Sequence, residues 1–405
     1  MRKTFIRFCV MQACWWGFQA AMPGFMTARM AAQGIGAAAM GTILAANLLC
    51  VFLGCLFWGR WVDRHQGSRR YYLIGNAAAL LSLLLWTFAD SVPLLMIQYP
   101  LFGFLTGAVA TVLDAWVIAS FPERRDAGSR SRSFATLTYA FVMLATGRLI
   151  PRLGYAVMPI IGFSFLAVSA LAALGQSEVS GPVLPRGQAG QKGGIRELLN
   201  VRVWVLLVGG MFFTGMCAAP INNMKVLILE SVGGDVGSLG LDSFVGCMVQ
   251  APFLLFSGRL QRISAGKRLI LGAMAAMGYA VMVMIARAPA LVTAGTILNN
   301  VSFGLLYPAM RQMTEENVPA RLRNTAHSLV DVAYGSLSGM AASAWGGMVM
   351  GSSGKQGLTA VCIAFQCVSL VFCTLVLLSQ SRGRRGEGLA RRAAGTLKRE
   401  LRMMN

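Results

Sequence analysis

The chain has 405 residues, of which 56% are hydrophobic and only 13% are charged. A soluble domain carries roughly 25% charged residues, so this composition excludes an ordinary water-soluble fold. The formal net charge of +21 would suggest nucleic acid as the partner of a soluble protein, and the positions of the basic residues argue against that reading below.

About twelve apolar segments follow one another, each with roughly the 20 residues that a membrane-spanning helix needs. The first is longer than the apolar core of a secretory signal peptide, so we expect it to stay as an uncleaved helix. The longest connection lies in mid-chain and is rich in Gly, Pro, Gln and Ser, as expected of a linker. The predicted spans are 5–28, 36–59, 71–89, 92–120, 133–150, 154–175, 201–229, 236–258, 268–287, 290–316, 323–350 and 357–380.

These spans predict an all-α membrane protein with twelve transmembrane helices in two pseudo-symmetric six-helix bundles. Residues 1–175 would form the first bundle, 176–200 a cytoplasmic linker, and 201–380 the second bundle. Residues 381–405 would form a basic tail, disordered or held at the membrane surface by anionic lipids.

The basic residues indicate the orientation of the chain. If both termini are cytoplasmic, all but six of the 36 lysines and arginines fall on the cytoplasmic side, which obeys the positive-inside rule. We therefore expect a multi-pass protein of the inner (plasma) membrane, and the net charge requires no nucleic acid. The six exceptions are Arg29, Arg148, Arg152, Lys225, Arg287 and Lys355.

The sequence lacks the common motifs of metal binding, nucleotide binding and hydrolytic catalysis. The nine cysteines lie in apolar segments without a CxxC pair, as expected of small buried residues. The sequence has no P-loop, HExxH or GxSxG motif. We expect no catalytic residues, no metal and no cofactor.

A loop motif, GRWVDRHQGSRR, follows the second span and is partly repeated after the eighth span. In the repeat Arg262 stands where the first copy has Asp63. Equal glycine spacing in both copies, and a proline after spans four and ten, indicate duplicated halves. The motif residues are Gly59, Asp63, Arg64, Gly67, Arg69 and Arg70 in the first copy, and Gly258, Gly266, Lys267 and Arg268 in the second.

This motif resembles the signature loop between the second and third helices of the major facilitator superfamily, with one residue inserted. The resemblance implies transport by alternating access. It also implies that Asp63 lies against the start of helix 11, where the helix dipole favours negative charge, and locks the cytoplasmic gate. Gly67 is expected to supply the tight turn. The GxxxG pairs at 103–107 and 335–339 suit close contact between helices.

Finer features resemble the lactose-permease-like branch, which includes proton symporters of oligosaccharides, nucleosides and aromatic acids. In its sugar permeases a helix-4 acid and a helix-5 arginine hold the substrate, and Asp114 and Arg132 have these places here. The chain departs from the branch in helices 8 and 10, where Gln250, Asn299 and Ser302 replace the usual proton-binding residues. The stretches that carry this resemblance are 33–41, 114–115, 132–140 and 302–307.

The roles of the charged residues remain open at this point. Asp114 could bind substrate or a proton, or form a structural ion pair, and Arg132 could be an interfacial anchor. Asp331 could carry the coupling proton or pair with Arg311 or Arg323. Three further acids, Glu230, Asp235 and Asp242, are expected to be solvated at the outer rim.

Neutral polar residues at mid-membrane depth predict a cavity that suits a sugar or a nucleoside, although each could instead form an interhelical hydrogen bond. The resemblance implies a secondary active transporter, with proton-coupled uptake of a polar metabolite by a monomer. Its partners would be a small-molecule substrate, protons and anionic lipids. Efflux of amphiphilic compounds by proton antiport and a non-transporting sensor or scaffold are the alternatives. The cavity candidates are Asn47, Tyr139, Asn222, Asn223, Gln250, Asn299 and Tyr307.

Overall fold

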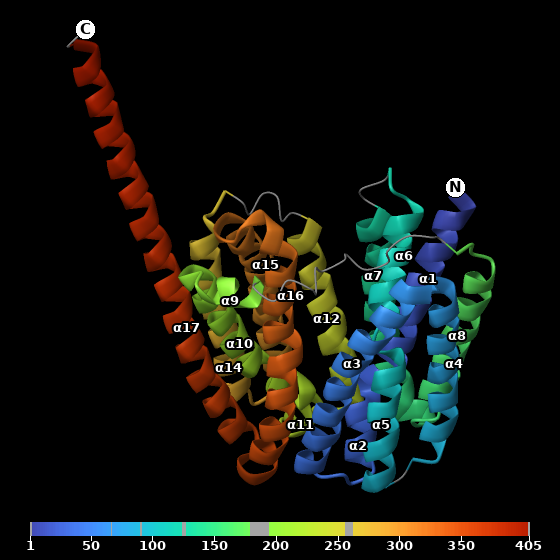
Figure 1. Ribbon diagram of the computed structural model, residues 1–405. Helices are drawn as coiled ribbons and strands as arrows, with labels where there is room; N and C mark the ends of the chain where they lie inside the picture. Colours follow the sequence, from blue (N-terminus) through green and yellow to red (C-terminus); the bar gives the residue numbers. More distant parts are fainter. Residues whose placement is uncertain are drawn as a thin grey trace.

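The computed structural model describes residues 2–65, 67–89, 91–123, 127–178, 194–255 and 262–403. Within these ranges the chain is almost entirely helical and contains no strand. The helices form two bundles that stand side by side, with both chain ends on the same side of the molecule (Figure 1). This architecture confirms the predicted all-α membrane fold.

The first half of the chain forms the N-terminal bundle. Its first helix is interrupted where Pro23 opens a short 3-10 turn, and the chain continues in the same direction. The elements are α1 (Arg2–Ala21), η1 (Pro23–Phe25), α2 (Met26–Ala32), α3 (Ala37–His65), α4 (Ser68–Thr87), α5 (Val92–Thr106), α6 (Val109–Ser120), α7 (Ala127–Leu153) and α8 (Val157–Leu174).

The second half forms the C-terminal bundle. Its last helix, α17, reverses direction at Gly354, whose φ of 61° lies in the left-handed region that glycine tolerates. The elements are α9 (Gly194–Leu199), α10 (Arg202–Asn223), α11 (Lys225–Glu230), α12 (Val236–Leu255), α14 (Ala265–Ile285), α15 (Pro289–Asn317), η2 (Ala320–Leu322), α16 (Arg323–Asp331), a π-helical turn η3 (Val332–Leu337) and α17 (Ser338–Met403).

Eight helical stretches of the described chain are long and apolar enough to cross a membrane. The last of them, 325–379, contains the reversal at Gly354 and so passes twice. Together with α1, α4 and α12, this order is consistent with the predicted twelve passages. Large apolar side chains face outward, as lipid contact requires: Phe88 is 76% exposed and Leu171 is 69% exposed.

Two predicted segments fall partly outside the described residues. Most of the predicted linker, 176–200, belongs to the undescribed stretch 179–193. The predicted tail, 381–405, continues the α17 backbone as a helix to Met403 and projects past the bundle on the side of the N-terminus (Figure 1). A helical tail replaces the disorder that we considered for it.

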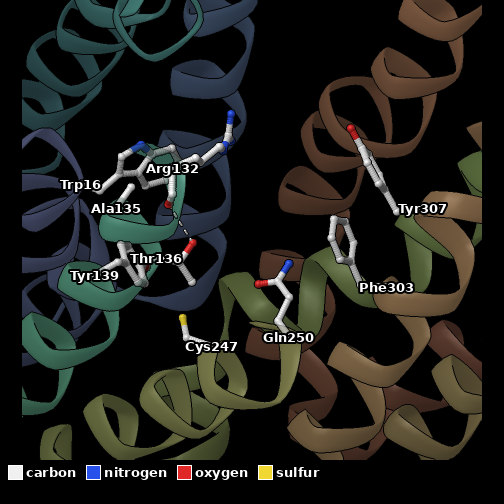
Figure 2. Close-up of a pocket in the computed structure, with 9 residues that line it drawn as sticks. All are labelled: Trp16, Arg132, Ala135, Thr136, Tyr139, Cys247, Gln250, Phe303 and Tyr307. Atoms are coloured by element: carbon white, nitrogen blue, oxygen red, sulfur yellow. Dashed lines mark hydrogen bonds between the residues drawn. The ribbon is translucent and has the colours of Figure 1, made fainter. Parts of the chain in front are cut away.

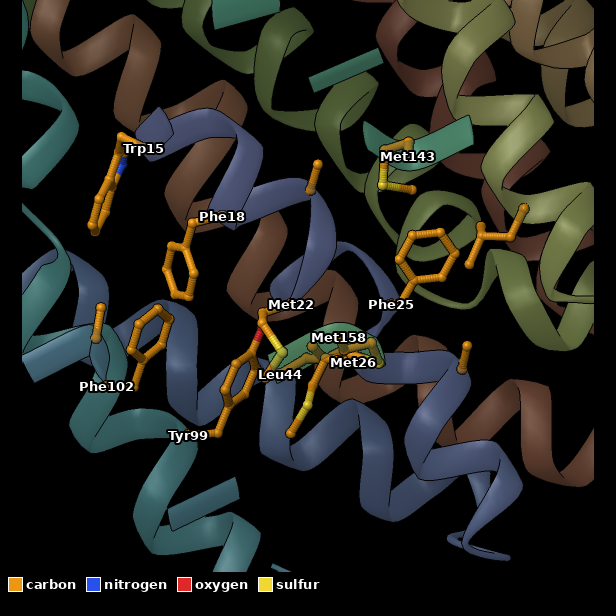
Figure 3. Packing of buried hydrophobic residues seen from close by; sticks show 14 of the residues in the cluster. Trp15, Phe18, Met22, Phe25, Met26, Leu44, Tyr99, Phe102, Met143 and Met158 are labelled. Carbon is orange, nitrogen blue, oxygen red and sulfur yellow. The ribbon is translucent and has the colours of Figure 1, made fainter. Parts of the chain in front are cut away.

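A dense apolar core holds the N-terminal bundle together. Phe18 of α1 packs edge-on against Phe102 of α5, with ring centroids 6.0 Å apart. Flexible methionines fill the space around these rings (Figure 3), which is the packing role expected of unbranched, polarizable side chains. The core therefore fixes α1 against the other helices of its bundle, and α1 supplies one wall of the cavity described below.

The two bundles touch each other at backbone distance at the end opposite the chain termini. There α3 crosses α17 and α7 crosses α12. A Cβ added at Gly347 would lie 2.4 Å from the carbonyl oxygen of Ala37, and one added at Gly240 would lie 2.5 Å from that of Met143. Only glycine fits these two positions without a shift, so the crossings close this end of the molecule.

The two predicted GxxxG pairs differ in how closely they approach a neighbouring helix. The pair at 103–107 packs within the N-terminal bundle, where a Cβ at Gly107 would lie 2.5 Å from the carbonyl oxygen of Val51 in α3. The pair at 335–339 makes no such approach, because a Cβ at Gly335 would meet open space. Gly335 lies on the π-helical turn η3, and a Cβ at Gly339, just beyond that turn, would make only an ordinary contact with the Leu48 side chain at 3.4 Å.

We expect Gly347→Ala to lower the free energy of unfolding by about 1–3 kcal/mol, the usual cost of overpacking. Gly351→Ala, one turn further along α17, is the matched control, because its Cβ would find its nearest neighbours at 3.8 Å. The control should be neutral or stabilising by up to about 1 kcal/mol, since alanine favours a helix. Thermal unfolding of the purified protein measures both, and equal effects would contradict the crossing.

Candidate functional site

A cavity of about 570 Å³ lies between the two bundles. Side chains of α1 and α7 form one wall, and side chains of α12 and α15 form the other (Figure 2). Its volume falls within the roughly 300–1,000 Å³ range of small-molecule sites. The lining residues are Trp16, Arg132, Ala135, Thr136, Tyr139, Cys247, Gln250, Phe303 and Tyr307.

The N-terminal wall carries an ion pair between Asp114 of α6 and Arg132 of α7. The carboxylate also accepts a hydrogen bond from the Gln12 side-chain amide at 2.6 Å. The guanidinium carbon of Arg132 lies 5.7 Å from the centre of the Trp16 ring, a cation–π distance. The ion pair carries no net charge. Because the Arg132 side chain is 55% exposed, its guanidinium still presents hydrogen-bond donors to the cavity.

A second ion pair, between Arg311 of α15 and Asp331 of α16, contacts the C-terminal wall through Tyr307. The Arg311 guanidinium donates to the Asp331 carboxylate at 2.6 Å and to the Tyr307 hydroxyl at 2.9 Å. Of the two partners considered for Asp331, the structure therefore selects Arg311. Arg323 instead contacts Glu315 at 3.1 Å.

Several predicted cavity residues lie elsewhere. Asn47 is buried in α3 against Gly103 of α5. Asn222 accepts a hydrogen bond from the Tyr279 hydroxyl at 2.9 Å, and Asn223 donates one to Ser343 at 2.7 Å. Asn222 and Asn223 therefore follow the interhelical alternative, whereas the Asn47 side-chain oxygen is buried without a hydrogen-bond partner. Asn299 is half-buried on α15 without joining the lining.

The loop motif is only partly described. The Asp63 side chain and the whole of Gly258 lie outside the described residues, so the structure does not test the proposed lock. Gly67 caps α4 with a φ of −112°, a conformation open to any residue, which corrects the expectation that its turn needs glycine. Arg69 donates its backbone N–H to the Glu178 carboxylate at 2.9 Å.

The basic residues of the second copy do not behave alike. Lys267 is exposed, as a cytoplasmic loop residue would be, whereas Arg268 is buried. The Arg268 side chain donates to the carbonyl oxygen of Ile263 at 3.1 Å and to the Gln312 side chain. It therefore ties the start of α14 to α15 instead of lying free at the surface.

The rim assignment of Asp242 was wrong. Its carboxylate is fully buried and meets the Lys225 ammonium at 2.9 Å, and both groups bond to the Thr296 hydroxyl. The rim prediction failed because of where α12 begins. Asp235 caps this helix, so Asp242 lies almost two turns inside it. Glu230 and Asp235 are exposed as expected, and hydrogen bonds from Ser238 hold the pKa of the Asp235 carboxyl below its usual range.

Removal of one member of this buried pair leaves an uncompensated charge, so we expect Asp242→Ala to cost about 3–5 kcal/mol of stability. The double variant Lys225→Met/Asp242→Leu should regain most of that loss, because an apolar pair needs no desolvation. Thermal unfolding of the three proteins measures the coupling. A double variant as unstable as Asp242→Ala would contradict the assignment of the loss to an unpaired lysine.

Two helical bundles around a central cavity, with a polar site on each wall, define a membrane transporter fold. Residues 14–359 match the model of the MFS_1 like family. The chain therefore belongs to this family of the major facilitator superfamily, as its loop motif indicated.

Individual relatives agree with this assignment. The chain is 24% identical over 358 residues to the maltose permease of Geobacillus stearothermophilus, covering 86% of this chain and 88% of the permease. It is 21% identical to the uncharacterized transporter YwbF of Bacillus subtilis, with 73% of each chain covered.

Solved structures share the fold at low sequence identity. A variant of the nucleoside transporter NupG matches with a TM-score of 0.79 and 12% identity, covering 93% of this chain and 98% of that one. A bacterial homologue of the human lysosomal transporter Spinster, inward-facing and unoccupied, matches with a TM-score of 0.66 and 13% identity, covering 92% and 96%.

Proposed function

We propose that this protein takes up a neutral polar metabolite, a sugar or a nucleoside, together with protons. The observation that carries this proposal is the composition of the cavity walls. Arg132, paired with Asp114, lines the cavity beside Trp16, and Arg311, paired with Asp331, contacts the lining residue Tyr307. Such pairs add no net charge, so a neutral solute can bind without leaving a charge unpaired in a site of low dielectric constant.

The chemistry of the lining favours hydroxyl-rich solutes. Arg132, Thr136 and Gln250 supply hydrogen-bond donors and acceptors, while aromatic rings offer flat apolar faces. The relatives support the same class, since one is called a maltose permease and a structural neighbour is called a nucleoside transporter. An open cavity of about 570 Å³ also argues against a sensor or scaffold, for which we would expect side chains to fill it.

Transport would proceed by alternating access. With the termini placed in the cytoplasm, the glycine crossings close the outer end, and the cavity faces inward. Rocking of the bundles would separate the crossings and bring the two ion pairs together. Protonation of the Asp114 carboxylate would weaken its hold on Arg132, which couples proton binding to the substrate site. Asp331 is the second candidate for the coupling proton, through Arg311.

The test is transport by purified protein in liposomes with an external pH indicator, challenged with maltose, glucose, uridine and benzoate. We expect one neutral solute to raise the external pH. Asp114→Asn should lower this coupled uptake at least about 10-fold, since hydrogen bonds to charged groups contribute about 1.5–3 kcal/mol.

Glu315→Gln is the matched control, because this exposed carboxylate of α15 bonds to His327 and Arg323 outside the cavity. It should transport like the wild type. Silence of the folded wild-type protein towards all four solutes, or a response to benzoate alone, would contradict uptake of a neutral polar metabolite.

A further inference from the structure

The two halves of the chain repeat with an offset of 197 to 199 residues, the spacing of their loop glycines and of the prolines that follow spans four and ten. The same offset relates the charged residues of the two ion pairs. Arg311 stands 197 residues after Asp114, and Asp331 stands 199 residues after Arg132. Equivalent positions therefore carry opposite charges: the acid precedes the base in the first half and follows it in the second.

The structure forms both pairs, and it surrounds them alike. Each pair joins the helices of equivalent passages, α6 to α7 and α15 to α16. Each guanidinium also lies over an aromatic ring of the cavity lining, Arg132 over Trp16 at 5.7 Å and Arg311 over Tyr307 at 5.1 Å. An aspartate, an arginine and a ring thus recur in both halves, and the two rings, Trp16 and Tyr307, line the same cavity (Figure 2).

We propose that Arg311, Asp331 and Tyr307 form a second ligand subsite that complements the one at Asp114, Arg132 and Trp16. The ligand is a neutral solute built of two polar rings, with one ring held by each bundle. This inference rests on the proposed function and specifies its substrate class. A single-ring solute fills one subsite, whereas a disaccharide or a nucleoside spans both.

The state of the second pair suits ligand binding. Arg311 and Asp331 are 36% and 39% exposed, so neither is locked into the interior as Lys225 and Asp242 are. A guanidinium offers donors and a carboxylate offers acceptors, which together match the hydroxyls of a sugar ring. The ring of Tyr307 stacks on Phe303, with centroids 5.3 Å apart, and this pair supplies the flat apolar surface beside them.

The backbone at this position supports the same reading. The π-helical turn η3 begins directly after Asp331 and ends before Ser338. Such turns replace the tighter α-helical bonding pattern and are frequent at functional sites. The turn also carries Tyr334, whose ring lies 6.3 Å from that of Phe303. The helix that bears Asp331 is therefore irregular just where it meets the cavity aromatics.

Binding of matched ligand pairs to the purified protein tests the subsite: glucose against maltose, and ribose against uridine. We expect one two-ring ligand to bind at least about 10-fold more tightly than its single-ring counterpart. The double variant Arg311→Gln/Asp331→Asn removes the pair without leaving a lone charge. It should abolish this ratio and change single-ring affinity by less than about 3-fold, whereas Asp114→Asn should weaken both ligands.

Arg323→Gln is the matched control, since Arg323 begins the same helix and pairs with Glu315. It should leave the ratio intact. A ratio that survives in the double variant overturns the subsite, and if transport is lost at the same time, the pair acts in gating instead. A folded wild-type protein that binds none of the four solutes overturns the proposed function itself, which separates that failure from failure of the subsite.

Discussion

The arrangement of this protein depends on the cost of placing charge inside a membrane. A carboxylate or an ammonium in hydrocarbon is expensive unless it meets a partner or water, and three ion pairs meet that constraint within the described helices. One is buried in the C-terminal bundle, where it can only hold helices together. The other two are partly exposed: Arg132 lines the cavity, and Arg311 contacts the lining residue Tyr307. The pairs are Lys225–Asp242, Asp114–Arg132 and Arg311–Asp331.

The positions of these ion pairs relative to the glycine crossings indicate how the two bundles would move. At one end, Gly41 and Gly347 of one crossing, and Gly147 and Gly240 of the other, bring the bundles to backbone contact. Towards the chain termini the bundles separate (Figure 1), and the half-exposed pairs lie on that side. Close-packed interfaces are bistable and not continuously deformable, so separation at the crossings implies approach at the other end. A neutral ligand between the pairs would then bridge the two bundles.

The sequence predicts the helices well, because hydropathy over about 20 residues is a strong signal. It also predicts the duplication, and a family resemblance placed Asp114 and Arg132 at a site. It left Asp331 undecided, because the choice between Arg311 and Arg323 depends on helix rotation. Asp242 was misplaced because its depth follows from the cap at Asp235, and its partner lies on a different helix. The polar residues inside the bundles were ambiguous for the same reason: a cavity and an interhelical hydrogen bond need the same side chains.

The most direct test of this account concerns the neutrality of the cavity. Affinity is measured by calorimetry for maltose and for two analogues of the same size, one with a carboxylate and one with an amine. Because each arginine is already matched by an aspartate, the account predicts that the neutral sugar binds most tightly and that both charged analogues bind at least about 10-fold more weakly. Tighter binding of the carboxylate analogue would show that Arg132 or Arg311 acts as an unpaired anion site, and would contradict the account.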